Sequence, residues 1–175
     1  MNDMKTTILD AAQRRIQLGG FGGFSFREIA DDVGVKSSSV HYHFPTKDDL
    51  AAAVVRRWAE NAAMHIDEAL EKEGDPIRAW VKTLRGTAVR EPHMCPCTIL
   101  GAGIQDLPLQ VASEVKTFFT MFLDKMRSQG LSVRAANELL ATVIGAIVVA
   151  NALGDSGVYD RATSNLLRRQ KELMP

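Results

Sequence analysis

The sequence predicts an all-α protein in which a small N-terminal domain is followed by a larger helical domain. Apolar residues recur at helical spacing along most of the 175 residues. Cap residues, glycines and prolines stand at the ends of these stretches, and strand patterns are few. We therefore expect a three-helix domain over residues 1–46 and a helical domain over residues 47–175.

The first helix is predicted over residues 4–18, where a pair of glycines ends it. Arg14 and Arg15 lie near its end, where each either approaches a phosphate or faces solvent. The apolar stripe of this helix consists of Ile8, Leu9, Ala12 and Ile16. Such a helix would brace the two short helices that follow it.

Residues 25–44 have the pattern of two short helices joined by a tight turn. Ser25 and Glu28 form a capping box at the start of the first short helix. Gly34 stands at the turn, where a residue without a Cβ adopts positive φ at little cost, and Val35 fills the angle between the helices. The apolar face of the first short helix consists of Phe26, Ile29, Ala30 and Val33. This is the layout of a helix-turn-helix.

The second short helix, residues 37–44, is the candidate recognition helix. Its three serines are small enough for a close approach to a DNA groove, and Val40 and Phe44 anchor its inner face. No acidic residue lies between Val33 and Lys47, so this stretch does not repel phosphates. Lys47 stands at the start of the next helix, which Thr46 caps, and a helix start favours an anion. The candidate DNA contacts are Ser25, Lys36, Ser37, Ser38, Ser39, His41, Tyr42, His43 and Lys47. The alternative for either histidine is a solvated side chain without a contact.

The segment resembles the N-terminal domain of the TetR family of bacterial transcriptional regulators. The matching features are Gly20-Phe21, Ser25, Ile29-Ala30, Gly34-Val35, the aromatic block ending in Phe44, Thr46-Lys47 and Leu50. The family usually carries a phosphate-binding tyrosine at the position of His41. It commonly has Gly, Ala or Thr at the positions of Ser38 and Ser39, so the preferred base sequence does not transfer.

The resemblance implies a DNA-binding transcriptional regulator with a helical domain for effector binding and dimerisation. It implies that the last two helices form a four-helix bundle with the same pair of a second subunit. It also implies that a bound effector tilts the helix linking the domains and changes the separation of the two DNA-binding heads. We therefore expect a homodimeric repressor of a palindromic double-stranded DNA operator, released by a small molecule.

The rest of the chain carries further helical patterns. A long helix over residues 47–72 ends before Gly74, and Asp75-Pro76 provides the cap and first-turn proline of the next one. The later helices are expected over residues 98–105, 109–127, 133–153 and 158–173.

The helix over residues 133–153 is apolar on more than one face, which predicts burial on two sides. A second copy of the chain is the simplest partner. Small residues one turn apart, Ala141 with Gly145 and Ala146 with Ala150, permit close helix approach. A seam of Val158, Ala162, Leu166 and Leu173 on the last helix extends this surface. The alternative is a monomer with an unusually apolar core helix.

An apolar effector pocket is expected between the linking helix and the helices after it. Its candidate residues, each of which can instead be plain core, are Trp58, Trp80, Met94, Cys95, Cys97, Phe118 and Phe122. Cys95 and Cys97 allow three interpretations: buried apolar thiols, a sensor of oxidants or electrophiles, and, with His93 and Met94, a metal site. The spacing lacks the four ligands of a structural zinc site, so no metal or other cofactor is expected.

Composition excludes several classes of protein. Lysine plus arginine and aspartate plus glutamate each total 21, so the net charge is zero, which is unlike a nonspecific nucleic-acid coat. The N-terminus has no export-signal pattern, and the most apolar run, residues 143–150, is far shorter than the roughly 20 residues of a membrane span. We therefore expect a cytoplasmic protein that does not associate with a membrane. The rivals are an enzyme with a Cys-His nucleophile, which no third catalytic group supports, and a helical adaptor that binds only protein.

Overall fold

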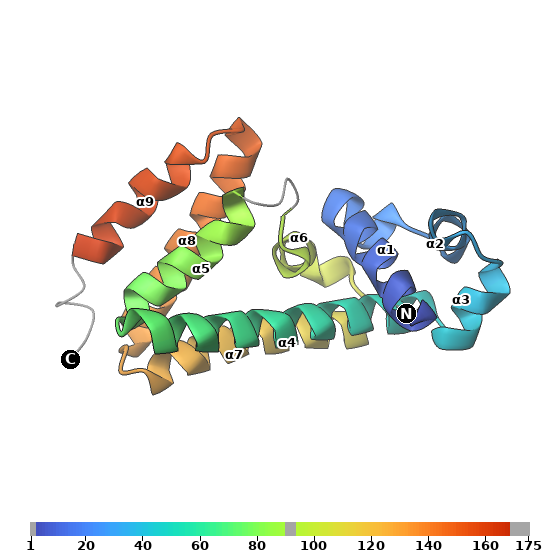
Figure 1. Ribbon diagram of the computed structural model, residues 1–175, viewed down its shortest axis with the longest axis horizontal. Helices are drawn as coiled ribbons and strands as arrows, with labels where there is room; N and C mark the ends of the chain where they lie inside the picture. Colours follow the sequence, from blue (N-terminus) through green and yellow to red (C-terminus); the bar gives the residue numbers. More distant parts are fainter. Residues whose placement is uncertain (1–2, 90–93, 169–175) are drawn as a thin grey trace. The chain divides into compact units, whose positions relative to one another are not determined.

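The computed structural model describes residues 3–89 and 94–168, and its regular structure there is entirely helical (Figure 1). The α-helices are α1 (Met4–Gly19), α2 (Phe26–Val33), α3 (Ser37–His43), α4 (Lys47–Glu73), α5 (Pro76–Val89), α6 (Pro96–Ala102), α7 (Leu109–Ser128), α8 (Val133–Leu153) and α9 (Gly157–Arg168). Two short 3-10 helices are η1 (Phe21–Gly23) and η2 (Ile104–Asp106). The predicted all-α class is confirmed.

The chain divides into two compact units. The first contains Met1–Ala59 and Cys95–Phe118, and the second contains Glu60–Met94 and Phe119–Pro175. The first unit holds α1, α2, α3 and α6 with the beginnings of α4 and α7. The second unit holds α5, α8 and α9 with the remainders of α4 and α7. The predicted functional division at residue 46 stays a prediction.

In the first unit, local side-chain caps begin the helices where the sequence predicts. The Ser25 hydroxyl accepts from the Glu28 N–H at 3.3 Å, and it donates to the Glu28 carboxylate at 2.8 Å. At the start of α4 the capping box is reciprocal, since the Asp49 N–H donates to Thr46 Oγ1 at 3.1 Å and the Thr46 N–H donates to Asp49 Oδ2 at 3.0 Å. Gly34 ends α2 with φ of 76°, as the turn requires.

Longer-range polar contacts hold the helices of the first unit together. Arg57 of α4 pairs with Asp10 of α1 at 2.8 Å. The Gln110 amide of α7 donates to Asp49 Oδ1 at 3.2 Å, so the carboxylate that caps α4 also contacts α7. Helix α6 packs against the end of α1, which Figure 1 shows beside it. The start of α4 is therefore fixed from two sides.

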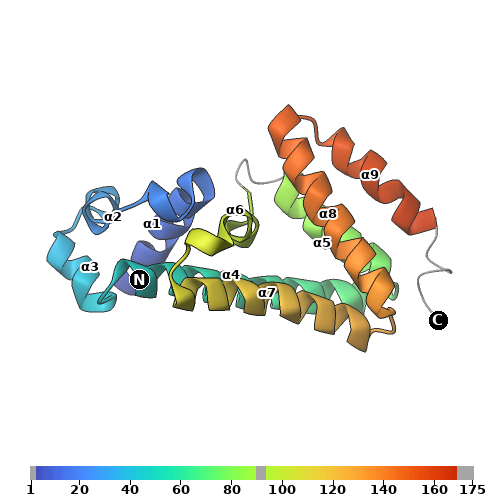
Figure 2. The same ribbon diagram turned by 180° about the vertical axis from the view of Figure 1, so that it is seen from behind.

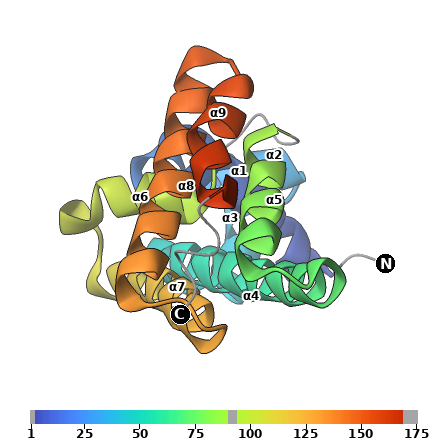
Figure 3. The same ribbon diagram turned by 90° about the vertical axis from the view of Figure 1, so that its left-hand side faces the viewer.

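In the second unit, α8 packs against both α5 and α9, as the views from behind and from the end show (Figures 2 and 3). The Tyr159 hydroxyl of α9 is buried and donates to the Val81 carbonyl of α5 at 2.7 Å. Burial raises the pKa of Tyr159 well above its usual range, so the hydroxyl stays protonated. Arg85 forms two hydrogen bonds with Asp160, of 2.6 and 2.7 Å, and joins the same two helices at the surface.

Two predicted helices differ from the structure. The helix expected over residues 98–105 begins earlier, with Pro96 in its first turn, and ends at Ala102. Gly103 then separates it from the 3-10 helix η2. The last helix begins at Gly157 and is described to Arg168, so the predicted seam residue Leu173 lies outside the described residues.

Helix α8 is longer than its most apolar run suggests. Its 21 residues are apolar enough, by length and composition alone, to cross a membrane. The expectation that no segment is long enough to span a membrane considered residues 143–150 alone and left out the rest of this helix. The packing of α8 against α5 and α9 explains its composition as that of a partly buried helix in a helical domain.

Candidate DNA-binding surface and effector-binding residues

Helix α3 presents one exposed polar face and one buried anchor. Ser38, His41 and Tyr42 are all exposed, and their spacing of three and four residues places them on one side of the helix. Tyr42 is the most exposed of them, at 85 %. Ser37, Ser39 and His43 are half-buried, so the structure divides the predicted contacts into a central face and its edges.

The inner side of α3 is packed as the sequence predicts. Val40 is 0 % exposed and Phe44 is 4 % exposed, so both residues belong to the core. The His41 ring also meets the Phe26 ring of α2 edge-to-face, with 4.5 Å between the ring centroids. The contact with α2 therefore holds the His41 ring in place, while the residue stays exposed to solvent.

Lys47 lies over two aromatic rings at the start of α4. Its Nζ is 4.6 Å from the centroid of Phe21 and 4.7 Å from that of Phe24. A lysine ammonium over aromatic faces is attracted to their negative charge density. The predicted phosphate-binding residue is thus held by the segment between α1 and α2, a contact that sequence spacing did not reveal.

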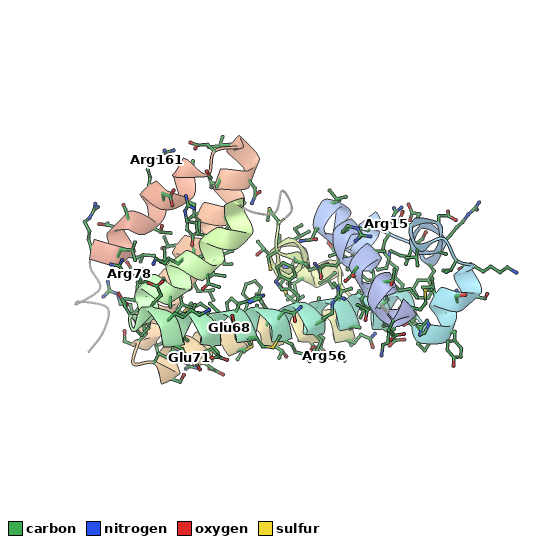
Figure 4. All side chains as sticks on the ribbon, in the orientation of Figure 1. Arg15, Arg56, Glu68, Glu71, Arg78 and Arg161 are labelled. Atoms are coloured by element: carbon green, nitrogen blue, oxygen red, sulfur yellow. The ribbon has the colours of Figure 1, made fainter. Side chains whose placement is uncertain are left out.

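Arg15 has a structural role and is neither a solvated side chain nor free for DNA. It projects from α1 (Figure 4) and forms two hydrogen bonds with Asp32 of α2, of 2.5 and 2.9 Å. A third contact, of 3.3 Å, reaches Glu28. The hydrogen bond from Arg15 lowers the pKa of Asp32 below its usual value, with the charge of Arg15 acting in the same direction. Arg15 therefore ties α1 to α2.

Arg27 is a candidate phosphate contact that the sequence prediction missed. It lies exposed in the first turn of α2, and within the described residues neither Arg27 nor the exposed Lys36 forms an ion pair. Lys36 is the residue that precedes α3, at its N-terminal end. The sequence contained a feature that could have identified Arg27, because it is the only lysine or arginine in α2. Arg27 lies on one short helix and Lys36 lies directly before the other, so both cations can meet phosphate oxygens.

The predicted effector residues fall in both units. Within the second unit, Trp80 and Phe122 lie together, with 5.0 Å between ring centroids and 67° between ring planes. Both are buried, at 0 % and 1 % exposed. Met94 of the second unit and Trp58 of the first are half-buried, while Phe118 of the first is buried.

Cys95 and Cys97 are buried free thiols in the first unit. Burial raises the pKa of Cys97 well above its usual value, and its contact with Cys95 acts in the same direction. Burial also opposes ionisation of Cys95, but hydrogen bonds from Cys97 and from the backbone of Thr98 lower the pKa of Cys95 overall. Cys95 is thus the thiol of the pair that ionises first. His93, the third member of the predicted cluster, lies outside the described residues.

No group of three or more His, Cys, Asp or Glu side chains suited to a metal ion occurs within residues 3–89 and 94–168.

Comparison with known proteins identifies the family of the chain. Residues 8–54 match the family model "Bacterial regulatory proteins, tetR family". The HTH-type transcriptional regulator LmrA of Bacillus subtilis (strain 168) is 30 % identical over 156 residues, covering 83 % of this chain and 82 % of LmrA.

Solved structures agree with this match along the whole chain. A TetR-family regulator from Agrobacterium tumefaciens has a TM-score of 0.84 at 29 % identity, covering 98 % of this chain and 97 % of its own. The fold also matches a TetR regulator from Legionella pneumophila, with a TM-score of 0.85 at 22 % identity and coverage of 100 % and 99 %. The chain therefore belongs to the TetR family, as a DNA-binding transcriptional regulator and not an enzyme.

Proposed function

We propose that this regulator is a homodimeric repressor that binds a roughly palindromic operator and leaves it when a small effector binds. The exposed face of α3 carries the proposal, because it combines Ser38, His41 and Tyr42 with an acid-free stretch from Gly34 to Thr46. Small and aromatic polar side chains on such a face can read base edges in the major groove. Ser25, Lys36, Ser37, Ser39, His43 and Lys47 are the proposed flanking contacts.

The exposed side of α8 supports the proposed dimer. Its exposed residues include Ala141, Gly145, Val148, Val149 and Ala152, at intervals of four, three, one and three residues. These intervals place all five along one helical stripe, and the two valines are 39 % and 46 % exposed. A stripe of small and apolar residues suits close packing against a second helix. Ala162 of the predicted α9 seam is exposed, whereas Leu166 is buried within its own subunit.

Zero net charge also favours a dimer. A neutral chain has weak long-range attraction for phosphates, so one head alone would bind DNA poorly. Two heads joined by a dimer interface raise the effective concentration of the second head at its half-site. As a soluble regulator that reads DNA, the protein would act in the cytoplasm.

The effector is proposed to bind in the helical domain. The buried Trp80 and Phe122 pair supports an apolar ligand. Release of DNA requires that the effector bind the nonbinding state more tightly than the DNA-binding state, by a few kcal/mol for a useful switch.

A gel-shift titration at low salt tests the DNA-binding face. The triple variant Ser38→Ala, His41→Ala, Tyr42→Ala removes the exposed polar groups of α3 and leaves its anchors Val40 and Phe44 in place. We expect the loss of sequence-specific binding, by at least about tenfold. Arg134→Ala, which removes an exposed cation from α8, is the control and should bind normally. Normal specific binding by the triple variant would contradict the assignment.

A further inference from the structure

Trp80 has a buried hydrogen-bond donor without an acceptor. The side chain is 0 % exposed, and its indole Nε1 has no hydrogen-bond partner among the described residues. Buried indole N–H groups normally donate to a protein or ligand acceptor, because an unpaired donor is unfavourable away from water. This N–H is therefore available to an acceptor that enters the core of the second unit.

Two buried hydroxyl groups of α9, which packs against α5, are already bonded. The Tyr159 hydroxyl donates to the Val81 carbonyl at 2.7 Å, and the Thr163 hydroxyl donates to the Tyr159 carbonyl at 2.8 Å. In the described part of the second unit, the other buried side-chain atom without a partner is Gln129 Oε1, after the end of α7. The unpaired indole thus stands out in a core whose other polar groups are largely satisfied.

We infer that the Trp80 indole N–H is the donor that recognises the effector, and that the effector is an apolar aromatic compound with an accessible acceptor such as a ketone oxygen. This inference rests on the proposed effector response. The edge-to-face contact of Trp80 with Phe122 provides aromatic surfaces on which a flat ligand can pack. The donor selects for an acceptor on that ligand, because only an acceptor satisfies the buried N–H.

Full burial of Trp80 also links ligand binding to packing. A ligand can reach the indole N–H only if the side chains around Trp80 separate, since no part of Trp80 is exposed. The ligand therefore stabilises an opened arrangement of the second unit over the packed one. Such a difference between states is what an effector needs in order to shift an equilibrium.

Proton–nitrogen NMR can observe this donor directly, because the chain has two tryptophans and therefore two indole N–H signals. The variant Trp58→Phe assigns the remaining signal to Trp80. The probes are 9-fluorenone and fluorene, which have nearly the same shape but differ in the ketone oxygen, with benzophenone and diphenylmethane as a second pair. We expect the ketones to move the Trp80 signal downfield and to bind about tenfold more tightly than the hydrocarbons.

The variant Trp80→Phe keeps an aromatic ring and removes the donor, so it should abolish the preference for ketones. If this variant does not fold, the spectra of Trp58→Phe, which retains Trp80, decide the question. The inference is overturned if neither ketone moves the Trp80 signal, if only the Trp58 signal moves, or if ketone and hydrocarbon bind equally.

A gel shift with a selected operator separates the inference from the proposed function. Release of DNA by the ketone, and not by its hydrocarbon partner, supports both. A ketone contact at Trp80 that leaves operator binding unchanged contradicts the effector role of Trp80. Failure of the ligand-free protein to bind any duplex contradicts the proposed function instead, and the NMR comparison still tests the donor.

Discussion

Lys47 has an observed contact with two aromatic rings and a proposed contact with DNA, and a single substitution removes both. Its ammonium lies over Phe21 and Phe24, and the same group is proposed to meet a phosphate at the start of α4. We predict that Lys47→Ala weakens binding to all duplexes and lowers the slope of log affinity against log salt by about 0.9, the value for one lost phosphate contact. It should also lower the melting temperature, because the cation–π contacts are lost.

Lys36→Ala is the matched control for this substitution. Lys36 is exposed and lies over no aromatic ring of residues 3–89 and 94–168, so its loss should change the salt slope without changing the melting temperature. A salt slope for Lys47→Ala equal to that of the wild type would remove Lys47 from the phosphate contacts and leave it a purely structural role.

Arg15 gives a stability prediction with a defined dependence on pH. Arg15→Met removes the bonds to Asp32 and should lower the free energy of unfolding by roughly 0.5 kcal/mol at neutral pH, a small value because the pair is partly exposed. The pKa of Asp32 is lowered in the folded state, so this contribution is present above the unfolded pKa of the carboxyl. It disappears as pH falls through the folded pKa.

Urea unfolding of wild type and Arg15→Met between about pH 2 and pH 7 measures the effect against the ordinary carboxyl pKa. The two curves should converge at the acid end. Arg14→Met is the control for a nearby charge, since Arg14 is exposed and acts on Asp32 through its charge alone, so it should change stability less than Arg15→Met. A difference that persists unchanged at low pH would show that packing of the arginine, and not its ion pair, is responsible.

Variants of Cys95 and Cys97 distinguish a plain core role of these thiols from the alternative in which they sense electrophiles. Cys95 lies at the N-terminal end of α6 and receives hydrogen bonds from Cys97 and from the backbone of Thr98, which favour its thiolate, so we predict that a soft electrophile reacts at Cys95 first. If the protein senses such compounds, Cys95→Ser abolishes DNA release by an electrophile such as N-ethylmaleimide, while Cys97→Ser retains it. Full release by the double serine variant rules out thiol sensing.

At the residue scale, the sequence predicts which side chains are inside more reliably than which partners they meet. Val40 and Phe44 were predicted as anchors, because their four-residue spacing places them on one helical face. The pairing of Arg15 with Asp32 spans 17 residues. It depends on the rotation of α1 against α2, which a local pattern does not define. The contact of Lys47 with the Phe21 and Phe24 rings could not be predicted for the same reason, because it also depends on how the segments pack.

At the scale of helices, local chemistry fixes most of the ends. Ser25, Thr46 and Ser132 precede helices that begin where the sequence predicted, and Gly34 and Gly154 follow predicted ends with positive φ. The start of α6 was missed, because Cys95 precedes it and cysteine is not among the usual cap residues. Pro96 was the available signal, since proline is favoured in the first turn.

The exposed stripe of α8 gives a prediction at the same scale. Val149→Glu places a charge in the proposed interface and should convert the dimer to a monomer of 19.2 kDa, with loss of operator binding. Light scattering coupled to size exclusion measures the mass. Leu109→Glu is the control, because Leu109 is 89 % exposed on α7 and is not part of the stripe, and this substitution should leave mass and binding unchanged. A dimeric Val149→Glu protein would place the interface elsewhere.

For the whole molecule, the family and the helical order were predictable, while the ligand and the operator were not. The family pattern is concentrated in residues 8–54, where caps, turn and anchors have fixed spacing. The proposed effector-binding side chains come from helices far apart in sequence, so which of them meet depends on tertiary packing. The base preference is proposed to depend on Ser38, His41 and Tyr42 together, and no helical pattern encodes it.

The most direct test of the account is the selection of bound fragments from random DNA duplexes, using ligand-free wild-type protein at moderate salt. Two copies of α3 on one duplex should select two half-sites related by twofold symmetry, one helical turn or a multiple of it apart. The triple α3 variant should select no motif. Selection of no common sequence by the wild type, or of a single half-site without symmetry, would contradict the account.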